Sequence, residues 1–235
     1  MPTYTLDLSI DANDLETITG AGENIIVAKP VNIAGATPNV AWLSIVPLEG
    51  NQIIWTEDYA MYASTTQAQG GASIFQTSAT SYPAEDGICY ELDAGGVFTG
   101  PVASPQPVSA GSYSTINSYT ALPAMTLGLT QSATTTSGNF TLSPLNAQSV
   151  PGNQQVIFTP LTTVWVWLQA QLSSGVVLTK VTSNVAVVTF GGSVTTQSLA
   201  YDPTHGQFEP TSGSSANVTF LDFTRYGGSP AKKLR

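Results

Sequence analysis

The stretch QVIFTPLTTVWVWLQAQL, residues 155–172, is the clearest indication of how this chain folds. Its centre joins β-branched residues to Trp165 and Trp167, a composition that is typical of β-strands. Because successive side chains of a strand point to opposite faces, the two indoles lie on the same face. We expect that face either to be buried or to bind a ligand.

An earlier stretch, QIIWTEDYAMYAS at 52–64, looks like a second copy of the same sequence. Residues 52–56 align with 155–159, and Tyr62 then aligns with Trp165. The similarity predicts that one β unit occurs twice in the chain. It also predicts that the two halves have equivalent strands in the same order.

The predicted duplication divides the chain into four segments. Residues 1–104 would form a first β-sandwich unit and residues 125–224 a second. Between them, residues 105–124 are rich in Pro, Ser and Gly, which predicts a linker. Residues 225–235 contain most of the Lys and Arg residues and are predicted to be a basic C-terminal tail.

Short apolar or alternating runs recur along both halves, each bounded by Gly, Pro, Asn or Asp. Such spacing is typical of β-sandwiches. Residues 11–19 alone favour a helix, with Asp11 as its N-cap and acidic residues in its first turn. The predicted fold class is therefore all-β: two tandem β-sandwich units, jelly-roll or immunoglobulin-like, with at most one short helix near the N-terminus.

Charge is the most unusual property of the composition. Charged residues make up 9% of the chain, against an average of about 25%, and the net charge is −9. The first 93 residues contain Lys29 as their one base, whereas residues 94–201 contain Lys180 and no acid. An acidic first half excludes nucleic acid as a partner, because binding to phosphates depends on basic groups.

The nearly uncharged span, residues 94–201, predicts a surface that is covered in the working protein. The centres of protein interfaces are depleted of charge, whereas exposed surfaces usually carry it. The cover would be further copies of the chain, or a target without charge. We therefore expect a homo-oligomer that binds a neutral glycan or a membrane surface.

The N-terminus has neither the basic start nor the apolar core of a signal peptide. This predicts that the protein is made in the cytoplasm, and leaves open whether it is later released to act outside the cell. No run of 18 apolar residues occurs, so no transmembrane helix is predicted. Cys89 is the only cysteine, which excludes an internal disulfide.

The residues that carry catalytic chemistry are sparse. His205, the single histidine, lies in the turn-like sequence YDPTHG, and no Gly-x-Ser-x-Gly motif supplies a nucleophile. Adjacent acids such as Glu57 and Asp58 point to opposite faces of a strand, so each pair offers one carboxylate to a cleft. No catalytic residue and no cofactor are predicted, although a hydrolase that uses His205 or a carboxylate remains an alternative.

Four residues near the N-terminus are weak candidates for a cation site, and they are Asp11, Asn13, Asp14 and Glu16. Their oxygens could bind calcium, but they do not follow the order of an EF-hand loop. Capping and acidic residues in the first turn of a helix explain the same cluster. We therefore predict no metal site.

Aromatic side chains are better candidates for ligand binding. Such rings can stack on sugar faces or anchor a protein at a lipid interface. The candidates lie in or beside the strongest predicted strands, and they are Tyr59, Tyr62, Trp165 and Trp167. The alternative is that the rings fill the core, which we favour for Trp42, Trp55 and one of the Trp165 and Trp167 pair.

In composition, the chain resembles cytoplasmically made lectins and toxins, which are rich in Thr, Ser and Gly, low in charge and built of β units. The likeness covers the whole chain but identifies no site residue. It implies a non-enzymatic recognition protein, lectin-like or a toxin component, that binds a cell-surface glycan or lipid. The alternatives are a self-assembling structural subunit of a shell, filament or capsid and, third, a hydrolase.

Overall fold

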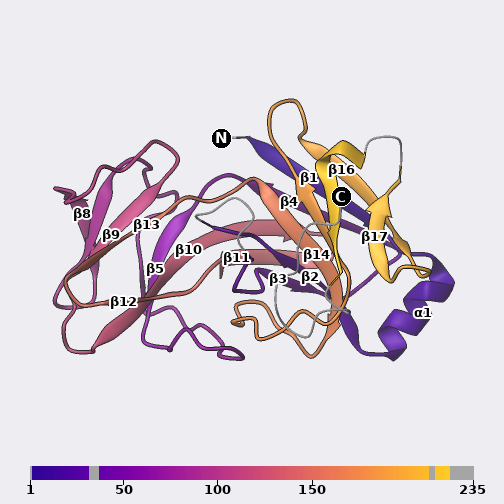
Figure 1. Ribbon diagram of the computed structural model, residues 1–235, viewed down its shortest axis with the longest axis horizontal. Coiled ribbons are helices and arrows are strands. Elements are labelled where there is room, and N and C mark those ends of the chain that lie inside the picture. The colour runs from indigo at the N-terminus through magenta and orange to yellow at the C-terminus, as the bar shows by residue number, and fades with distance from the viewer. Residues whose placement is uncertain (1, 32–36, 212–214, 223–235) are drawn as a thin grey trace.

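The computed structural model describes residues 2–31, 37–211 and 215–222 (Figure 1). About half of the chain, 51%, is in strands and 5% is helical, so the all-β prediction is confirmed. The molecule is elongated in this view, with a small sheet at one end and the helix at the other. The predicted basic tail, residues 225–235, lies outside the described residues.

The largest sheet has nine strands: β1 (Thr3–Ser9), β4 (Gly50–Thr56), β5 (Ala60–Ser64), β6 (Ser78–Ala79), β10 (Ala124–Thr135), β11 (Gly138–Pro144), β12 (Gln148–Pro151), β16 (Thr196–Asp202) and β17 (Gln207–Pro210). Their order is β17-β16-β1-β4-β10-β5-β6, and β11 and β12 also pair with β10. The strand β10 pairs with four neighbours, β4, β5, β11 and β12. Its ladder with β11 is irregular between Gln131 and Ala133.

Two smaller sheets complete the fold. The five-stranded sheet has the order β18-β15-β14-β2-β3 and consists of β2 (Glu23–Ala28), β3 (Leu43–Ile45), β14 (Thr163–Ala170), β15 (Val185–Thr189) and β18 (Val218–Leu221). The four-stranded sheet has the order β13-β9-β7-β8 and consists of β7 (Cys89–Leu92), β8 (Phe98–Val102), β9 (Tyr113–Asn117) and β13 (Gln154–Phe158). A 3-10 helix, η1 (Ser215–Asn217), precedes β18.

Two tandem sandwich units are not confirmed. Strands from both predicted units pair directly, β1 with β16, β4 with β10 and β2 with β14. The predicted linker, 105–124, contributes β9 to the interior of the four-stranded sheet. Residues 52–64 form β4 and β5 of one sheet, whereas 155–172 supply β13 and β14 to two different sheets. The similarity reflects shared strand-forming residues rather than a shared strand order.

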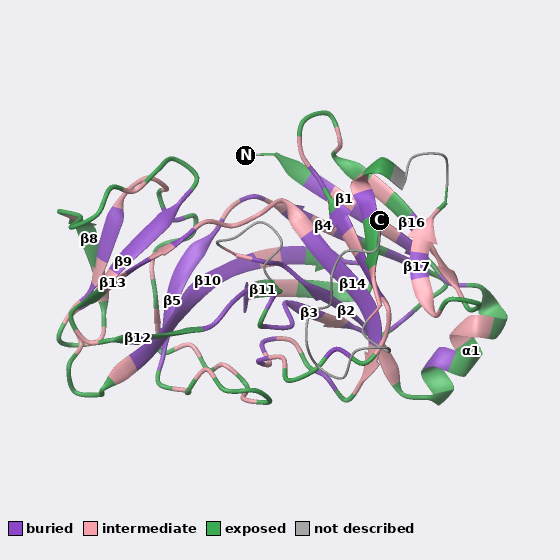
Figure 2. Ribbon diagram, viewed as in Figure 1, coloured by how far each residue is buried: buried purple, intermediate pink, exposed green. Residues whose placement is uncertain are grey.

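Strand β14, which contains Trp165 and Trp167, is buried on both faces (Figure 2). Val164, Val166 and Leu168 belong to the main core, which draws residues from all three sheets. Trp165 and Trp167 lie in a second cluster with Ile26, Ala28, Ala41, Leu172, Val181 and Val185. The two indoles therefore share a face, as predicted. That face is covered by the chain itself.

The single α-helix of the described residues, α1 (Ala12–Gly20), is the one that the sequence predicts. The Asp11 side chain accepts a hydrogen bond from the Asn13 N–H at 3.0 Å, which is the expected N-cap. Ile18 is its one buried residue. No helix among the described residues is long and apolar enough to cross a membrane.

Candidate functional site

The four aromatic residues predicted to bind a ligand are interior residues. Tyr59 is 2% exposed and Trp165 is 5% exposed, while Tyr62 and Trp167 are fully buried. The Tyr62 hydroxyl donates to the Asn146 carbonyl at 2.6 Å, and Trp167 Nε1 donates to Gln169 Oε1 at 2.8 Å. Rings placed in this way hold strands together and offer no face to a ligand in solution.

The weak cation candidates Asp11, Asn13, Asp14 and Glu16 lie at the start of α1, where Asp11 caps the helix. A different group has the geometry that could hold a metal ion. Within the described part of the chain, Asp202, His205 and Glu209 are the three His, Cys, Asp or Glu residues whose ligand atoms lie close together. We call these three residues the His205 cluster.

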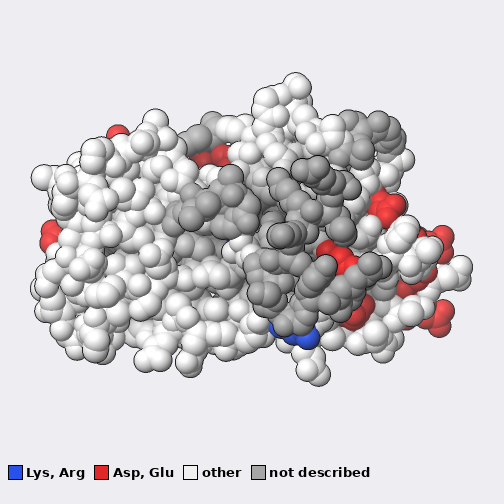
Figure 3. Space-filling model, viewed as in Figure 1, with Lys and Arg blue, Asp and Glu red and all other residues white. Residues whose placement is uncertain are grey.

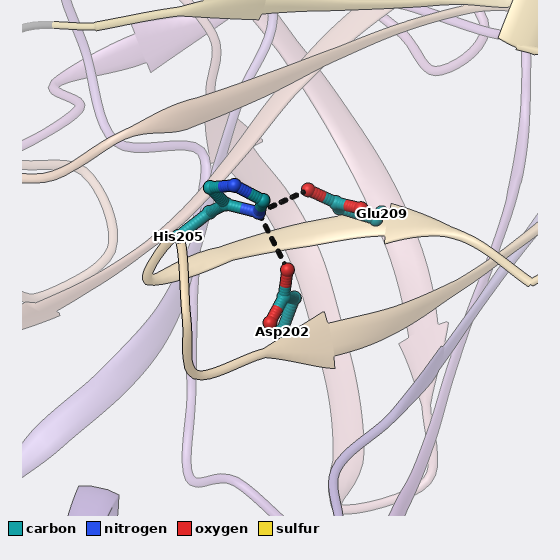
Figure 4. Close-up of side chains that lie close together, drawn as sticks. All are labelled: Asp202, His205 and Glu209. Carbon is teal, nitrogen blue, oxygen red and sulfur yellow. Dashed lines mark hydrogen bonds and ion pairs between the residues drawn. The ribbon is translucent and has the colours of Figure 1, made fainter.

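The hairpin of β16 and β17 assembles the His205 cluster (Figure 4). Asp202 ends β16, His205 lies in the turn and Glu209 belongs to β17. The His205 Nδ1 atom lies 2.6 Å from Asp202 Oδ2 and 3.0 Å from Glu209 Oε1. Asn184 Nδ2 donates to the His205 carbonyl at 2.7 Å and so holds the turn against the start of β15.

The His205 cluster lacks the parts of a hydrolase site. The histidine side chain is 61% exposed, and within the described residues no serine, threonine or cysteine side chain hydrogen-bonds to its ring. The three ligand atoms lie within 4.8 Å of one another, and nitrogen and carboxylate oxygen are ligand types that zinc accepts. Their mutual ion pairs already explain the geometry, so we treat the cluster as an ion-paired turn.

The carboxylates of the cluster shift the protonation of His205. The Asp202 hydrogen bond and charge, with a smaller effect of Glu209, raise the pKa of His205 above its ordinary value. The Thr204 backbone N–H and then His205 lower the pKa of Asp202. Asp202→Asn should therefore lower the pKa of His205 more than Glu209→Gln does. Because the chain has one histidine, an NMR titration of the imidazole reads this pKa without assignment.

Equal titration curves for Asp202→Asn and the unaltered protein would contradict the ion-paired geometry of the turn. Glu49→Gln, which removes an acid that pairs with no base among the described residues, is the matched control. It should leave the His205 curve where it is.

A buried polar cluster surrounds Lys29, and we call it the Lys29 cluster. The Lys29 side chain is fully buried, and its Nζ donates to Glu57 Oε1 at 2.7 Å, to the Tyr59 hydroxyl at 2.6 Å and to Gln131 Oε1 at 3.2 Å. Trp55 Nε1 donates to the same Glu57 oxygen at 2.9 Å, and Tyr59 donates to the other. Burial lowers the pKa of Lys29 to about 8, against the opposing effect of Glu57.

A surface groove of about 360 Å³ lies where β4, β10 and β11 meet the loop after β6, and we call it the neutral groove. The groove contains no charged residue, and its lining consists of Ile54, Trp55, Thr56, Tyr82, Ser132, Ala133, Thr134, Asn139, Phe140 and Thr141. Thr134 is opposite Ile54 on one side and Asn139 on the other, so these three side chains lie in one row on one face.

No family model, no curated protein and no solved structure matches the chain. The function of the protein is therefore inferred from the geometry of the molecule itself.

Sequence reasoning missed both the Lys29 cluster and the neutral groove. One signal pointed to the first: Lys29 is the single base before residue 94, directly after an apolar strand. A lysine directly after an apolar strand is most easily explained by a buried acidic side chain that pairs with it. The neutral groove has no comparable signal, because its residues come from separate strands whose pairing is not visible in the sequence.

Proposed function

We propose that the protein is a non-enzymatic recognition protein, lectin-like, that binds a neutral carbohydrate in the neutral groove. The observation that carries the proposal is the lining, which combines hydroxyl and amide side chains with Tyr82 and contains no charged group. Tyr82 is 39% exposed. Within the described residues, the side chains of Thr134, Asn139 and Thr141 take part in no hydrogen bond, so they are available to a ligand.

Sugar chemistry fits these groups. A neutral sugar presents hydroxyls that both donate and accept hydrogen bonds, which amide and hydroxyl side chains can match. Its apolar C–H face can lie against an aromatic ring. An ionic ligand would find no counter-charge here. The volume is near the lower end of the range for small-molecule pockets, which suits a short sugar.

Two other surface hollows have similar volumes, of about 340 and 350 Å³. The first includes the carboxylate of Asp7, and neither is lined by an aromatic residue. The neutral groove is therefore the hollow that combines an exposed ring with uncharged polar groups. This combination is the reason for choosing it.

The charge distribution supports a neutral target and a homo-oligomer as parts of the same proposal. Acids gather around α1 in the view of Figure 3, whereas the opposite end is almost uncharged in that view. Lys180 is the one exposed Lys or Arg among the described residues, since Lys29 is buried. A neutral surface permits close approach of copies of the chain, and several copies would strengthen binding to a repeated glycan.

The test is a glycan array that carries neutral and charged sugars, followed by titration of the best neutral ligand. Tyr82→Ala should weaken binding at least about tenfold, because it removes the ring, and Thr134→Lys should do the same by placing an unpaired charge in the groove. Both residues are exposed, so neither change should impair folding.

Thr99→Lys is the matched control, since Thr99 is exposed on β8 at the far end of the molecule (Figure 1). It should bind as the unaltered protein does. Binding that survives Thr134→Lys, or an array without a neutral ligand, would overturn the proposal. Regular particles seen by electron microscopy together with a blank array would favour the structural subunit instead.

A further inference from the structure

The Lys29 cluster lies between two sheets and brings together an amine, a carboxylate and an amide. Lys29 directly follows β2 of the five-stranded sheet, while Gln131 belongs to β10 and Glu57 directly follows β4 of the nine-stranded sheet. Lys29 Nζ reaches Gln131 Oε1 at 3.2 Å and Glu57 Oε1 at 2.7 Å. These are the groups that the conversion of one amide into another requires.

We propose that Lys29 and Gln131 become joined by an isopeptide bond between Nζ and the side-chain carbonyl carbon Cδ, with Glu57 carrying the proton. The link would tie the five-stranded sheet to the nine-stranded sheet covalently, across the main core.

The reaction balances without any further reagent. Glu57 takes a proton from the Lys29 ammonium, and the neutral Nζ attacks Cδ of Gln131 to form the new C–N bond. The bond from Cδ to Nε2 then breaks, and Nε2 leaves as ammonia after gaining the second of the two protons that remained on Nζ. The product is a secondary amide with one N–H. No atom is oxidised or reduced, and Glu57 ends with the proton that it can pass to the ammonia.

The surroundings favour the neutral amine that this step needs. Trp42, Trp55 and Tyr59 are almost completely buried, and Tyr59 and Trp55 lie beside Nζ, with ring centroids 4.9 and 6.0 Å from it. Removal of water penalises the ammonium form, which agrees with the lowered pKa of Lys29. In such a place an ion pair of Lys and Glu can pass its proton across and become two neutral groups.

Gln131 is held in a fixed orientation. Its Nε2 donates to the Thr56 carbonyl at 2.5 Å, and its backbone carbonyl accepts from Trp42 Nε1 at 3.1 Å. Oε1 is left facing Nζ. Two reacting groups fixed in this way react as if at very high concentration, which compensates for the low intrinsic reactivity of an amide.

The experiment is mass spectrometry of the full chain, unfolded after purification and after storage in mildly alkaline buffer. The unaltered protein should be lighter than its sequence by one ammonia, and digestion should yield one branched peptide that joins Lys29 to Gln131. Lys29→Arg and Gln131→Met should each have the full mass of their sequences. Gln52→Met, which removes an exposed glutamine outside the cluster, should still lose one ammonia.

Glu57→Gln tests the proton carrier. If this variant folds, as circular dichroism would establish, it should keep the full mass, and Glu57→Asp should restore part of the reaction. Unbranched peptides from the stored, unaltered protein would overturn the proposal. Loss of water rather than ammonia would also overturn it, since that product would join Lys29 to a carboxylate.

Discussion

Gly128→Ala is expected to lower the free energy of unfolding by at least about 3 kcal/mol, at or above the upper end of the effect of overpacking in a core. Gly128 lies in the middle of β10, where a Cβ atom would collide with the Asn146 carbonyl oxygen and lie 2.6 Å from Cε1 of Tyr62. The carbonyl cannot move freely, because it accepts the Tyr62 hydroxyl hydrogen bond. Urea unfolding of the variant measures the loss.

Gly50→Ala is the matched control for Gly128→Ala. Gly50 begins β4, and a Cβ atom there would meet nothing within 4 Å. Alanine at this position should leave stability unchanged or raise it by about 0.4–1 kcal/mol, because it restricts the unfolded chain. Equal effects of the two substitutions would show that β10 and the segment around Asn146 do not pack as described.

Trp167→Ala is expected to lower the free energy of unfolding by about 3–5 kcal/mol. The indole is fully buried beside Ile26 and Val185, and its loss would leave a large cavity and remove the hydrogen bond to Gln169. Phe75→Ala is the control, since Phe75 is 75% exposed and its truncation should change stability by no more than about 0.5 kcal/mol. Thermal or urea unfolding compares the two.

A small effect of Trp167→Ala would mean that the second face of β14 is open rather than covered. It would return Trp167 to the set of ligand-binding candidates. The comparison therefore decides between the two roles that the sequence allows for this ring.

Local features of the fold were predictable because neighbouring residues determine them. Asp11 and the acidic residues after it specify a capped helix. Trp165 and Trp167 specify a strand with one large apolar face. The turn at Gly191 and Gly192 also forms, with two backbone hydrogen bonds between Gly191 and Val194. It joins β15 and β16, which belong to different sheets, so these two strands do not form a hairpin.

Strand order was not predictable, because it depends on partners far away in the sequence. The alternation in residues 4–10 indicates a half-buried strand, but nothing in it indicates β16 as a neighbour. The same limit applies to the sites. Tyr59 and Tyr62 are aromatic residues of a type that often binds ligands, but they are buried. Tyr82, Thr134 and Asn139 line the neutral groove, although no sequence pattern marks them.

The position of β1 determines when this chain can finish folding. β1 lies between β4 and β16, antiparallel to the first and parallel to the second, so residues 3–9 complete their ladder only with residues 196–202. A ribosome releases those residues long after it has released β1. Until then one edge of β1 has unpaired backbone N–H and C=O groups, and another chain could pair with it. The nine-stranded sheet therefore closes only after residues 196–202 have left the ribosome, and the growing chain must keep that edge of β1 unpaired until then.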